Sequence, residues 1–157
     1  MRFNLSFLAL ISSATAVPLT DTDTTNTTST ILFTRSESYK CGGGWICGSH
    51  DHLKRCDQSV NHYLVRTDEV LYGSAGSGRE KDGACPPESH FACKIFVAGA
   101  DHCARSGNEM WQDYQDIRNK KKGNCNGGRN TCGTKNWGDG CRTTVDYVAY
   151  CDPKQVF

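Results

Sequence analysis

Apolar residues recur every three or four positions in two segments of the chain, the spacing that places side chains on one face of a helix. The apolar positions of the first segment are Leu53, Cys56, Val60, Tyr63 and Leu64. They predict a helix over residues 51–67, and Ser49 or Asp51 can cap its N-terminus. The apolar positions of the second segment are Met110, Tyr114 and Ile117. They predict another helix, which Ser106 or Asn108 can cap.

Runs of apolar, β-branched and aromatic residues predict strands elsewhere. Residues 91–98 are apolar enough for a buried strand, residues 142–150 are rich in β-branched and aromatic side chains, and residues 69–72 fit a short strand. Two glycine-rich stretches, 73–83 and 123–140, have the composition of surface loops. This mixture of elements predicts the α+β class, with a largely antiparallel sheet.

Residues 1–16 have the features of a secretory signal peptide. Arg2 supplies the basic start, residues 5–11 form a short apolar run, and a small-residue cleavage site ends at Ala16. The run is much shorter than the ~20 residues that span a bilayer, so we predict a secreted, extracellular protein with no membrane insertion. Residues 17–38 are dominated by Thr, Asp and Ser, which predicts a disordered linker or pro-segment, and Asn26 begins an N-glycosylation sequon.

Ten cysteines follow the signal peptide. They are Cys41, Cys47, Cys56, Cys85, Cys93, Cys103, Cys125, Cys132, Cys141 and Cys151. An even number in an oxidising compartment predicts five disulfide bonds, although sequence alone leaves their pairing open. We therefore predict a single disulfide-stapled domain over residues 39–157. The formal net charge of +1 excludes a strongly basic nucleic-acid binder.

One segment has the spacing of a zinc site. Its candidate ligands are Cys47, His50, His52 and Cys56. A zinc site needs thiolates, whereas the cysteines of a secreted protein oxidise to disulfides, so we favour two disulfide cysteines and two solvated histidines. We expect neither a metal nor a cofactor.

Histidine can supply acid–base catalysis, because imidazole titrates near neutral pH. His90 has Glu88 nearby and His102 follows Asp101, so a ribonuclease-like enzyme that uses His90 or His102 is one alternative function. The five histidines are scattered from residue 50 to residue 102, and no segment resembles the active-site pattern of small secreted ribonucleases. We therefore predict no catalytic residues.

A cell-wall glycan-binding module is a further alternative. In this case Trp45, Trp111 and Trp137 would stack on sugar rings. Trp45 and Trp137 lie in glycine-rich turns, where aromatic side chains can be exposed, whereas Trp111 can equally belong to the core.

Basic residues concentrate in one segment of a chain that is otherwise close to neutral. Between residues 118 and 142 there are seven basic residues and a single acid, Asp139. The basic residues are Arg118, Lys120, Lys121, Lys122, Arg129, Lys135 and Arg142. Such a segment can bind an anionic partner, and the alternative is a solvated loop that maintains solubility. The residues that we predict to bind a partner are Lys120, Lys121, Lys122, Arg129 and Lys135.

Cysteine-anchored segments follow one another in a distinctive order over residues 39–151. They are the glycine-rich Cys41–Cys47, then His90-Phe91-Ala92-Cys93, Gly123-Asn124-Cys125, Cys132-Gly133-Thr134, and Thr143-Thr144-Val145-Asp146-Tyr147-Val148 before Cys151. Together with the helix after the first segment, this order resembles the ten-cysteine killer toxins of smut fungi, the KP-four type, and related secreted fungal proteins. In the founding toxin a lysine stands just before the cysteine equivalent to Cys93. Phe91 and Ala92 occupy that place here, and the nearest lysine, Lys94, is a further binding candidate.

The resemblance implies a compact α/β sandwich in which two helices pack on an antiparallel sheet. It also implies that Cys41 pairs with Cys125 and Cys47 with Cys132, and it leaves the other six cysteines unassigned. For function it implies a monomeric toxin or effector that binds a membrane protein or another component of a target-cell surface. A calcium channel is the narrower expectation for that partner.

Overall fold

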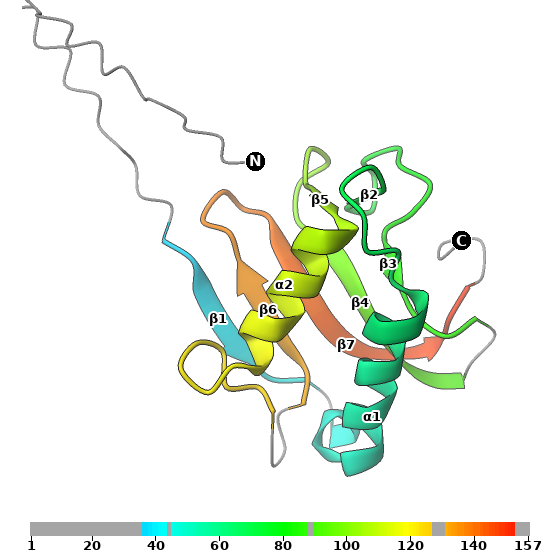
Figure 1. Cartoon of the computed structure of the whole chain (residues 1–157), viewed down its shortest axis with the longest axis vertical. Helices are drawn as coiled ribbons and strands as arrows, with labels where there is room; N and C mark the ends of the chain where they lie inside the picture. Colours follow the sequence, from blue (N-terminus) through cyan, green and yellow to red (C-terminus); the bar gives the residue numbers. More distant parts are fainter. Residues whose placement is uncertain (1–35, 44, 88–89, 127–130, 153–157) are drawn as a thin grey trace, which may run out of the picture. The chain divides into compact units, whose positions relative to one another are not determined.

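The computed structural model describes residues 36–43, 45–87, 90–126 and 131–152. These residues form a five-stranded antiparallel sheet in the order β1-β6-β7-β4-β3 and a two-stranded sheet, β2-β5 (Figure 1). The strands of the larger sheet are β1 (Ser38–Cys41), β6 (Gly133–Asn136), β7 (Arg142–Tyr150), β4 (His90–Ala98) and β3 (Gly83–Ala84). The strands of the smaller sheet are β2 (Leu71–Gly73) and β5 (Ala104–Ser106).

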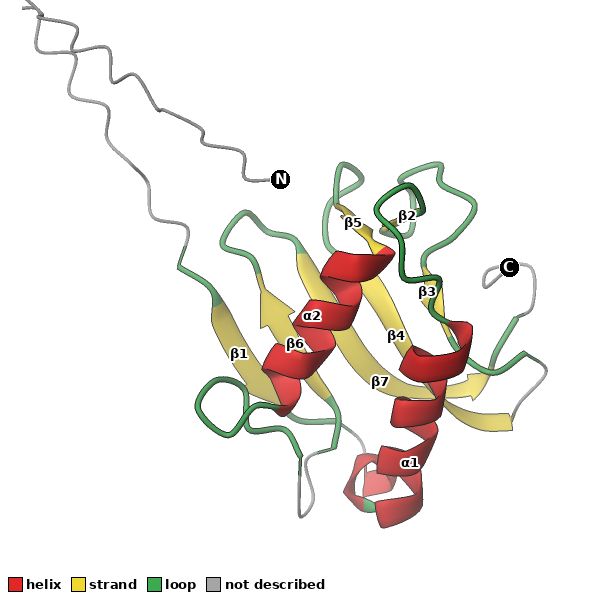
Figure 2. Cartoon of the chain, in the orientation of Figure 1, coloured by secondary structure: helices red, strands yellow, loops and turns green. Residues whose placement is uncertain are grey.

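Two helices, α1 (His50–Gln58) and α2 (Gly107–Arg118), cover the same face of the five-stranded sheet (Figure 2). The core between the two layers is built from apolar side chains of both, including Val60, Ile95, Met110, Ile117 and Val145. This arrangement confirms the predicted α+β class and the two-helix sandwich. In the described ranges no helix has the length and apolar character needed to cross a membrane.

Helix α2 begins as its sequence predicts. The Ser106 side chain accepts a hydrogen bond from the Glu109 N–H at 3.2 Å, and the Glu109 carboxylate accepts one from the Ser106 N–H at 2.9 Å. This reciprocal capping box satisfies two backbone donors that would otherwise lack partners. The predicted apolar face of Met110, Tyr114 and Ile117 is buried, as expected.

Helix α1 is shorter than its predicted range of 51–67. Ser49 caps it by accepting a hydrogen bond from the His52 N–H at 3.1 Å. After Gln58 the chain widens into a π-helical turn over Ser59–Tyr63, and it leaves the helix at Leu64, whose backbone is extended. The apolar spacing predicted the buried face correctly, but it carries no information on this change of helical pitch.

The two longest strands, β4 and β7, confirm the predicted strands at 91–98 and 142–150. Four strands, β1, β3, β5 and β6, were not predicted, and β6 lies within a stretch assigned to a loop. Gly133 and Lys135 fill the buried positions of β6. The alternation of apolar and polar residues that identifies a strand is therefore missing there.

The ten cysteines form five disulfides. Cys41–Cys125 and Cys47–Cys132 are the two pairs that the resemblance implied. The remaining pairs are Cys56–Cys93, Cys85–Cys151 and Cys103–Cys141. Bridges of this kind compensate for the small core of a domain of this size. The predicted signal peptide and the sequon at Asn26 lie outside the described residues, whereas Ser38, the last residue of the predicted linker, belongs to β1.

Candidate functional site

The basic segment 118–142 does not form one exposed patch. Lys120 and Lys121 are exposed just after α2, and Arg129 lies outside the described residues. The Lys122 ammonium lies 2.7 Å from a carboxylate oxygen of Asp116. The Arg118 guanidinium donates hydrogen bonds to the backbone carbonyls of residues 125 and 131, so it connects the end of α2 to the chain that follows.

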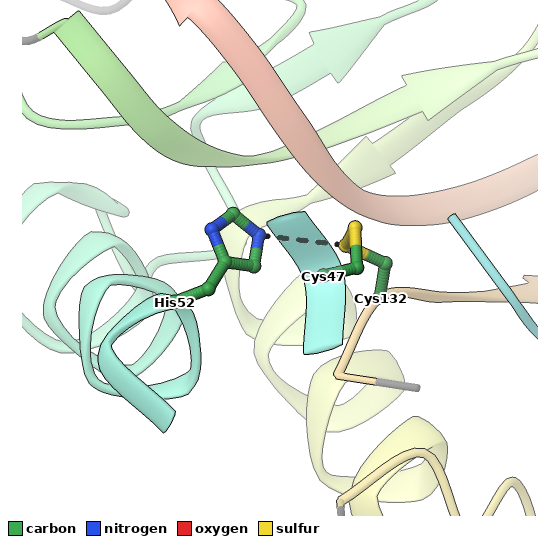
Figure 3. A group of neighbouring side chains, drawn as sticks. All are labelled: Cys47, His52 and Cys132. Carbon is green, nitrogen blue, oxygen red and sulfur yellow. Dashed lines mark hydrogen bonds between the residues drawn. A yellow bond between two sulfur atoms is a disulfide. The ribbon is translucent and has the colours of Figure 1, made fainter. Parts of the chain in front are cut away.

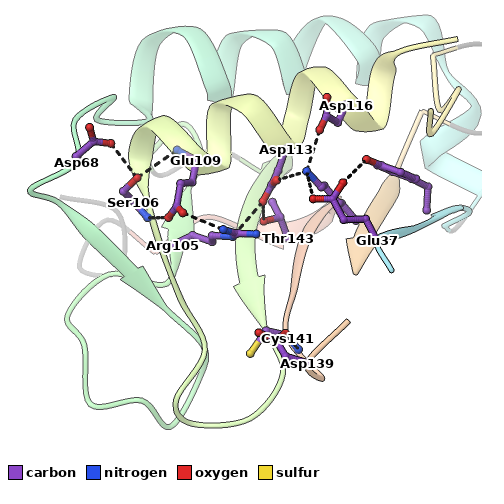
Figure 4. Close-up of polar contacts among 12 residues, drawn as sticks. Glu37, Asp68, Arg105, Ser106, Glu109, Asp113, Asp116, Asp139, Cys141 and Thr143 are labelled. Atoms are coloured by element: carbon purple, nitrogen blue, oxygen red, sulfur yellow. Dashed lines mark hydrogen bonds and ion pairs between the residues drawn. The ribbon is translucent and has the colours of Figure 1, made fainter. Parts of the chain in front are cut away.

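Lys135 was predicted to bind a partner at the surface, but the structure corrects this because the residue is only 5% exposed. Its ammonium lies 2.9 Å from Asp113, 2.8 Å from Asp116 and 3.2 Å from Glu37. Asp113 also accepts a hydrogen bond from the Thr143 hydroxyl (Figure 4). These five residues, which we call the Lys135 network, join α2 to β6, to β7 and to Glu37, the residue just before β1.

The charges in the Lys135 network stabilise one another. Burial by itself would lower the pKa of Lys135, but hydrogen bonds to Asp116, Asp113 and Glu37 outweigh it and raise that pKa. Burial would likewise raise the pKa of Asp116, yet its bonds with Lys122 and Lys135 hold that pKa below its usual value. Lys135 and Asp116 are therefore both charged at neutral pH, and each is paired with partners inside the protein.

Lys94 is also buried, with its ammonium 2.7 Å from a carboxylate oxygen of Asp82. The pair lies at a pocket of about 240 Å³, lined also by Phe96 and Val148. Lys94 is therefore held in an ion pair and is not presented to a partner as an isolated cation.

The two tryptophans whose side chains the structure describes, Trp111 and Trp137, do not provide an open stacking surface. Trp137 is buried, and the Arg105 guanidinium lies 3.9 Å from the centre of its ring. Trp111 is half-buried and packs against the core, and the Arg66 guanidinium lies 5.3 Å from its ring centre. The side chain of Trp45 lies outside what the structure describes.

The structure separates the two histidines named for the ribonuclease-like alternative, which used His90 or His102. His90 begins β4 and His102 follows its far end, and because a strand of nine residues is roughly 30 Å long, the two cannot act together on one bond. In the described part of the chain three groups of histidine and cysteine lie close enough to share an ion, but every cysteine in them belongs to a disulfide. The zinc-like spacing fails for this reason, since residues 47 and 56 bond to different partners.

His52 belongs to two of these groups. It is 1% exposed, and its Nε2 lies 3.4 Å from the sulfur of Cys132, while its other ring nitrogen points away from the disulfide (Figure 3). That second nitrogen, Nδ1, has no hydrogen-bond partner among the described residues. Burial lowers the pKa of His52, so the ring is neutral at pH 7.

Phe91 is a second residue whose exposure was predicted wrongly. It was expected in a buried strand, but it is 59% exposed and has a backbone φ of 58°. Residues other than glycine rarely adopt this left-handed conformation, and for a bulky side chain it is an outlier. Strand β4 pairs with β7 at His90–Tyr150 and again at Ala92–Val148, and Phe91 lies between these two pairs.

Neighbouring side chains hold Phe91 in place. The Arg55 guanidinium, from α1, donates to the carbonyl oxygen of Phe91 at 2.6 Å and to that of His90 at 3.4 Å. The Phe91 ring stacks on Tyr147, with 6.0 Å between centroids, and the His90 ring packs on Tyr150 at 5.5 Å. The result is a layer of aromatic rings at the start of β4.

A pocket of about 260 Å³ opens between this aromatic layer and the N-terminal half of α1. The residues that line it are Ile46, Ser49, Asp51, His52, Arg55 and Phe91. We call these six residues the Phe91 pocket. Asp51 is exposed and makes no hydrogen bond or ion pair within the described ranges, so its carboxylate is open to a ligand.

The fold and the cysteine framework define a small α+β protein stapled by five disulfides. A model of the Meiotically up-regulated gene family, MU117, matches residues 39–151, and the chain belongs to this family. No curated protein and no solved structure matches the chain. The matched range runs from just before the first disulfide cysteine to the last, so the family match covers the whole stapled domain.

Proposed function

We propose that this chain is a secreted, killer-toxin-like protein that acts by binding a component of a target-cell surface rather than by turning over a substrate. The observation that carries the proposal is Phe91, a large apolar side chain that is exposed and held in an unfavourable backbone conformation. Such a conformation costs about 1–3 kcal/mol and persists where the surrounding structure enforces it, typically at functional sites. Stability alone would favour glycine at this position.

Further observations support a binding role. Five disulfides persist in oxidising compartments such as the extracellular space, and they make the domain a rigid support for a binding surface. The two-helix sandwich and the bridges Cys41–Cys125 and Cys47–Cys132 are those that the killer-toxin resemblance implied. The family name refers to genes up-regulated in meiosis, which adds the producer's own cells during development to the candidate targets.

Binding to cells tests this proposal. The mature protein, secreted with its disulfides formed, would be incubated with intact fungal cells, and bound protein and growth would be measured. We expect the wild type to be retained and to inhibit growth, and Phe91→Gly to lose both. Leu71→Ser is the matched control, because Leu71 is 41% exposed on the two-stranded sheet and should be dispensable.

Two results would contradict the proposal. The first is a wild-type protein that neither binds cells nor affects their growth. The second is a Phe91→Gly protein as active as the wild type. The narrower proposal of a calcium-channel target has its own test: added calcium should then relieve growth inhibition by the wild type, and inhibition that is insensitive to calcium would exclude that target.

A further inference from the structure

We propose that the Phe91 pocket binds a sugar ring of a neutral glycan. This inference rests on the proposed function, because it names the chemistry of the surface component that the protein binds. It differs from a tryptophan stacking surface, since it places the sugar on Phe91, with polar groups of α1 beside it.

The aromatic layer provides the apolar half of such a site. One face of a pyranose ring presents C–H groups, which pack well against the π-face of an aromatic ring. Phe91 is 59% exposed, and its contact with Tyr147 together with the Arg55 hydrogen bond to its carbonyl fixes the orientation of the ring. A ring positioned in advance loses little conformational entropy when a ligand binds.

The α1 side of the pocket provides the polar half. The Asp51 carboxylate accepts hydrogen bonds and the Arg55 guanidinium donates them, which is the mixture that sugar hydroxyls require. Ser49 adds a hydroxyl group at the same rim. His52, whose buried Nδ1 lacks a partner among the described residues, also lines this pocket.

The charge and size of the pocket select against other ligands. Asp51 and Arg55 cancel in charge, so an anionic ligand would gain little net attraction there and would face the Asp51 carboxylate. A purely apolar ligand would cover the Asp51 carboxylate without offering it a hydrogen bond, which is costly. The volume of about 260 Å³ lies just below the range of roughly 300–1,000 Å³ typical of drug-sized ligands, which suits a single sugar residue of a longer chain.

Calorimetric titration with defined oligosaccharides tests the inference. The probes are chitohexaose, laminarihexaose and mannohexaose, each a neutral chain of pyranose rings, titrated into the disulfide-bonded protein. We expect saturable binding of at least one probe, weakened at least tenfold in Phe91→Gly and several-fold in Asp51→Asn. Leu71→Ser should bind as the wild type does. Phe91→Gly is preferred to Phe91→Ala because glycine adopts the native backbone conformation without strain.

Three outcomes would overturn the inference. One is that none of the three probes binds the wild type at millimolar concentration. Another is binding that Phe91→Gly leaves unchanged. The third is binding restricted to a sulfated chain, such as dextran sulfate, that is lost in Lys120→Glu/Lys121→Glu. If the wild type binds cells through Phe91 but takes none of the probes, the glycan inference fails and the proposed function stands. If the wild type binds no cells, the proposed function fails, and the titration alone decides the inference.

Discussion

The two helices cover two regions that use polar residues in opposite ways. Beneath α2, Lys135 is surrounded by Asp113, Asp116 and Glu37, so its charge is already balanced inside the protein. Beside α1, Asp51 is open to solvent, and Phe91 combines an exposed ring with an unfavourable backbone. A region that satisfies its own charges serves the fold, whereas a region that gives up stability to present groups outward points to a ligand.

This comparison also separates the basic residues that the sequence groups together. Lys122 and Lys135 belong to the α2 region as partners of Asp116, and Lys120 and Lys121 alone of the three consecutive lysines lie free of ion pairs within the described ranges. Sequence proximity is therefore a poor guide to which charges can meet a partner.

The largest effect should come from breaking the α2 region. Lys135→Met removes the cation and leaves Asp113 and Asp116 buried with less compensation, so we expect the free energy of unfolding to fall by about 3–5 kcal/mol. Denaturant titration of the oxidised protein measures this loss. Lys121→Met, at an exposed position, is the control and should change stability by less than about 0.5 kcal/mol. A loss below about 1 kcal/mol for Lys135→Met would show that the network contributes little.

The same region predicts how stability changes at acid pH. The pKa values of Glu37 and Asp116 are lowered by their bonds with lysines, against the opposing effect of burial. The unfolded chain therefore takes up protons first as pH falls below its carboxyl pKa values, and the stabilisation is lost as pH then falls through the lower folded values. Stability should decline more steeply below pH 4 in the wild type than in Lys135→Met. Denaturant titrations at each pH measure the free energy of unfolding of both proteins. If it falls with pH equally in both, this account is wrong.

The next largest effect on stability should come from relieving the backbone strain at Phe91. Phe91→Gly and Phe91→Ala both remove the ring, but alanine keeps the penalty of the left-handed backbone. We expect the glycine variant to be more stable than the alanine variant by about 1 kcal/mol, while both lose at least tenfold in cell binding. Thermal unfolding and the cell-binding assay provide the two readouts. Equal stability of the variants would mean that the backbone relaxes in solution, and the argument from strain would fail.

How well the sequence predicts each helix or strand depends on whether apolar residues recur at its buried positions. Apolar periodicity and a capping serine predicted α2, because Met110, Tyr114 and Ile117 recur at helical spacing among its buried positions. A run of β-branched and aromatic residues predicted β7. β6 was missed because Gly133 and a charged lysine, Lys135, occupy its buried positions. Its strand conformation depends on pairing with β7, the next strand along the chain, and with β1, which is distant in sequence.

The candidate site was less predictable than the fold. Phenylalanine has no preference for a left-handed backbone, so nothing in the local sequence indicates that Phe91 leaves the strand pattern. Its exposure depends on Arg55, which is held by α1 and reaches the Phe91 carbonyl from another element. One signal was present in the sequence: Asp51 and Arg55 lie four residues apart, and so on one face of a helix.

A smaller effect should come from His52, which lies in the wall of the Phe91 pocket. Burial lowers its pKa from the usual 6.5, Arg118 and Arg55 lower it further, and Asp146 partly opposes them. As pH falls below about 6.5 the unfolded chain binds a proton that the folded protein excludes, so stability decreases by at most about 1.4 kcal/mol per pH unit. The wild type should lose stability between pH 6.5 and pH 4.5 relative to His52→Gln, measured by denaturant titration at each pH. The same slope in both proteins would show that His52 titrates normally.

The smallest effect on stability should come from the two exposed lysines after α2. Lys120→Glu/Lys121→Glu should change the free energy of unfolding by less than about 0.5 kcal/mol, because neither lysine has an ion pair among the described residues. Lys122 is left unchanged, since a glutamate there would face Asp116.

If these lysines guide the protein to an anionic cell wall, the variant should associate more slowly with immobilised wall material, most clearly at low salt, and dissociate at the wild-type rate. Phe91→Gly should do the reverse, with faster dissociation and unchanged association. A double-lysine variant that dissociates faster would place these lysines in the bound interface, and the division between a steering loop and the Phe91 pocket would be wrong.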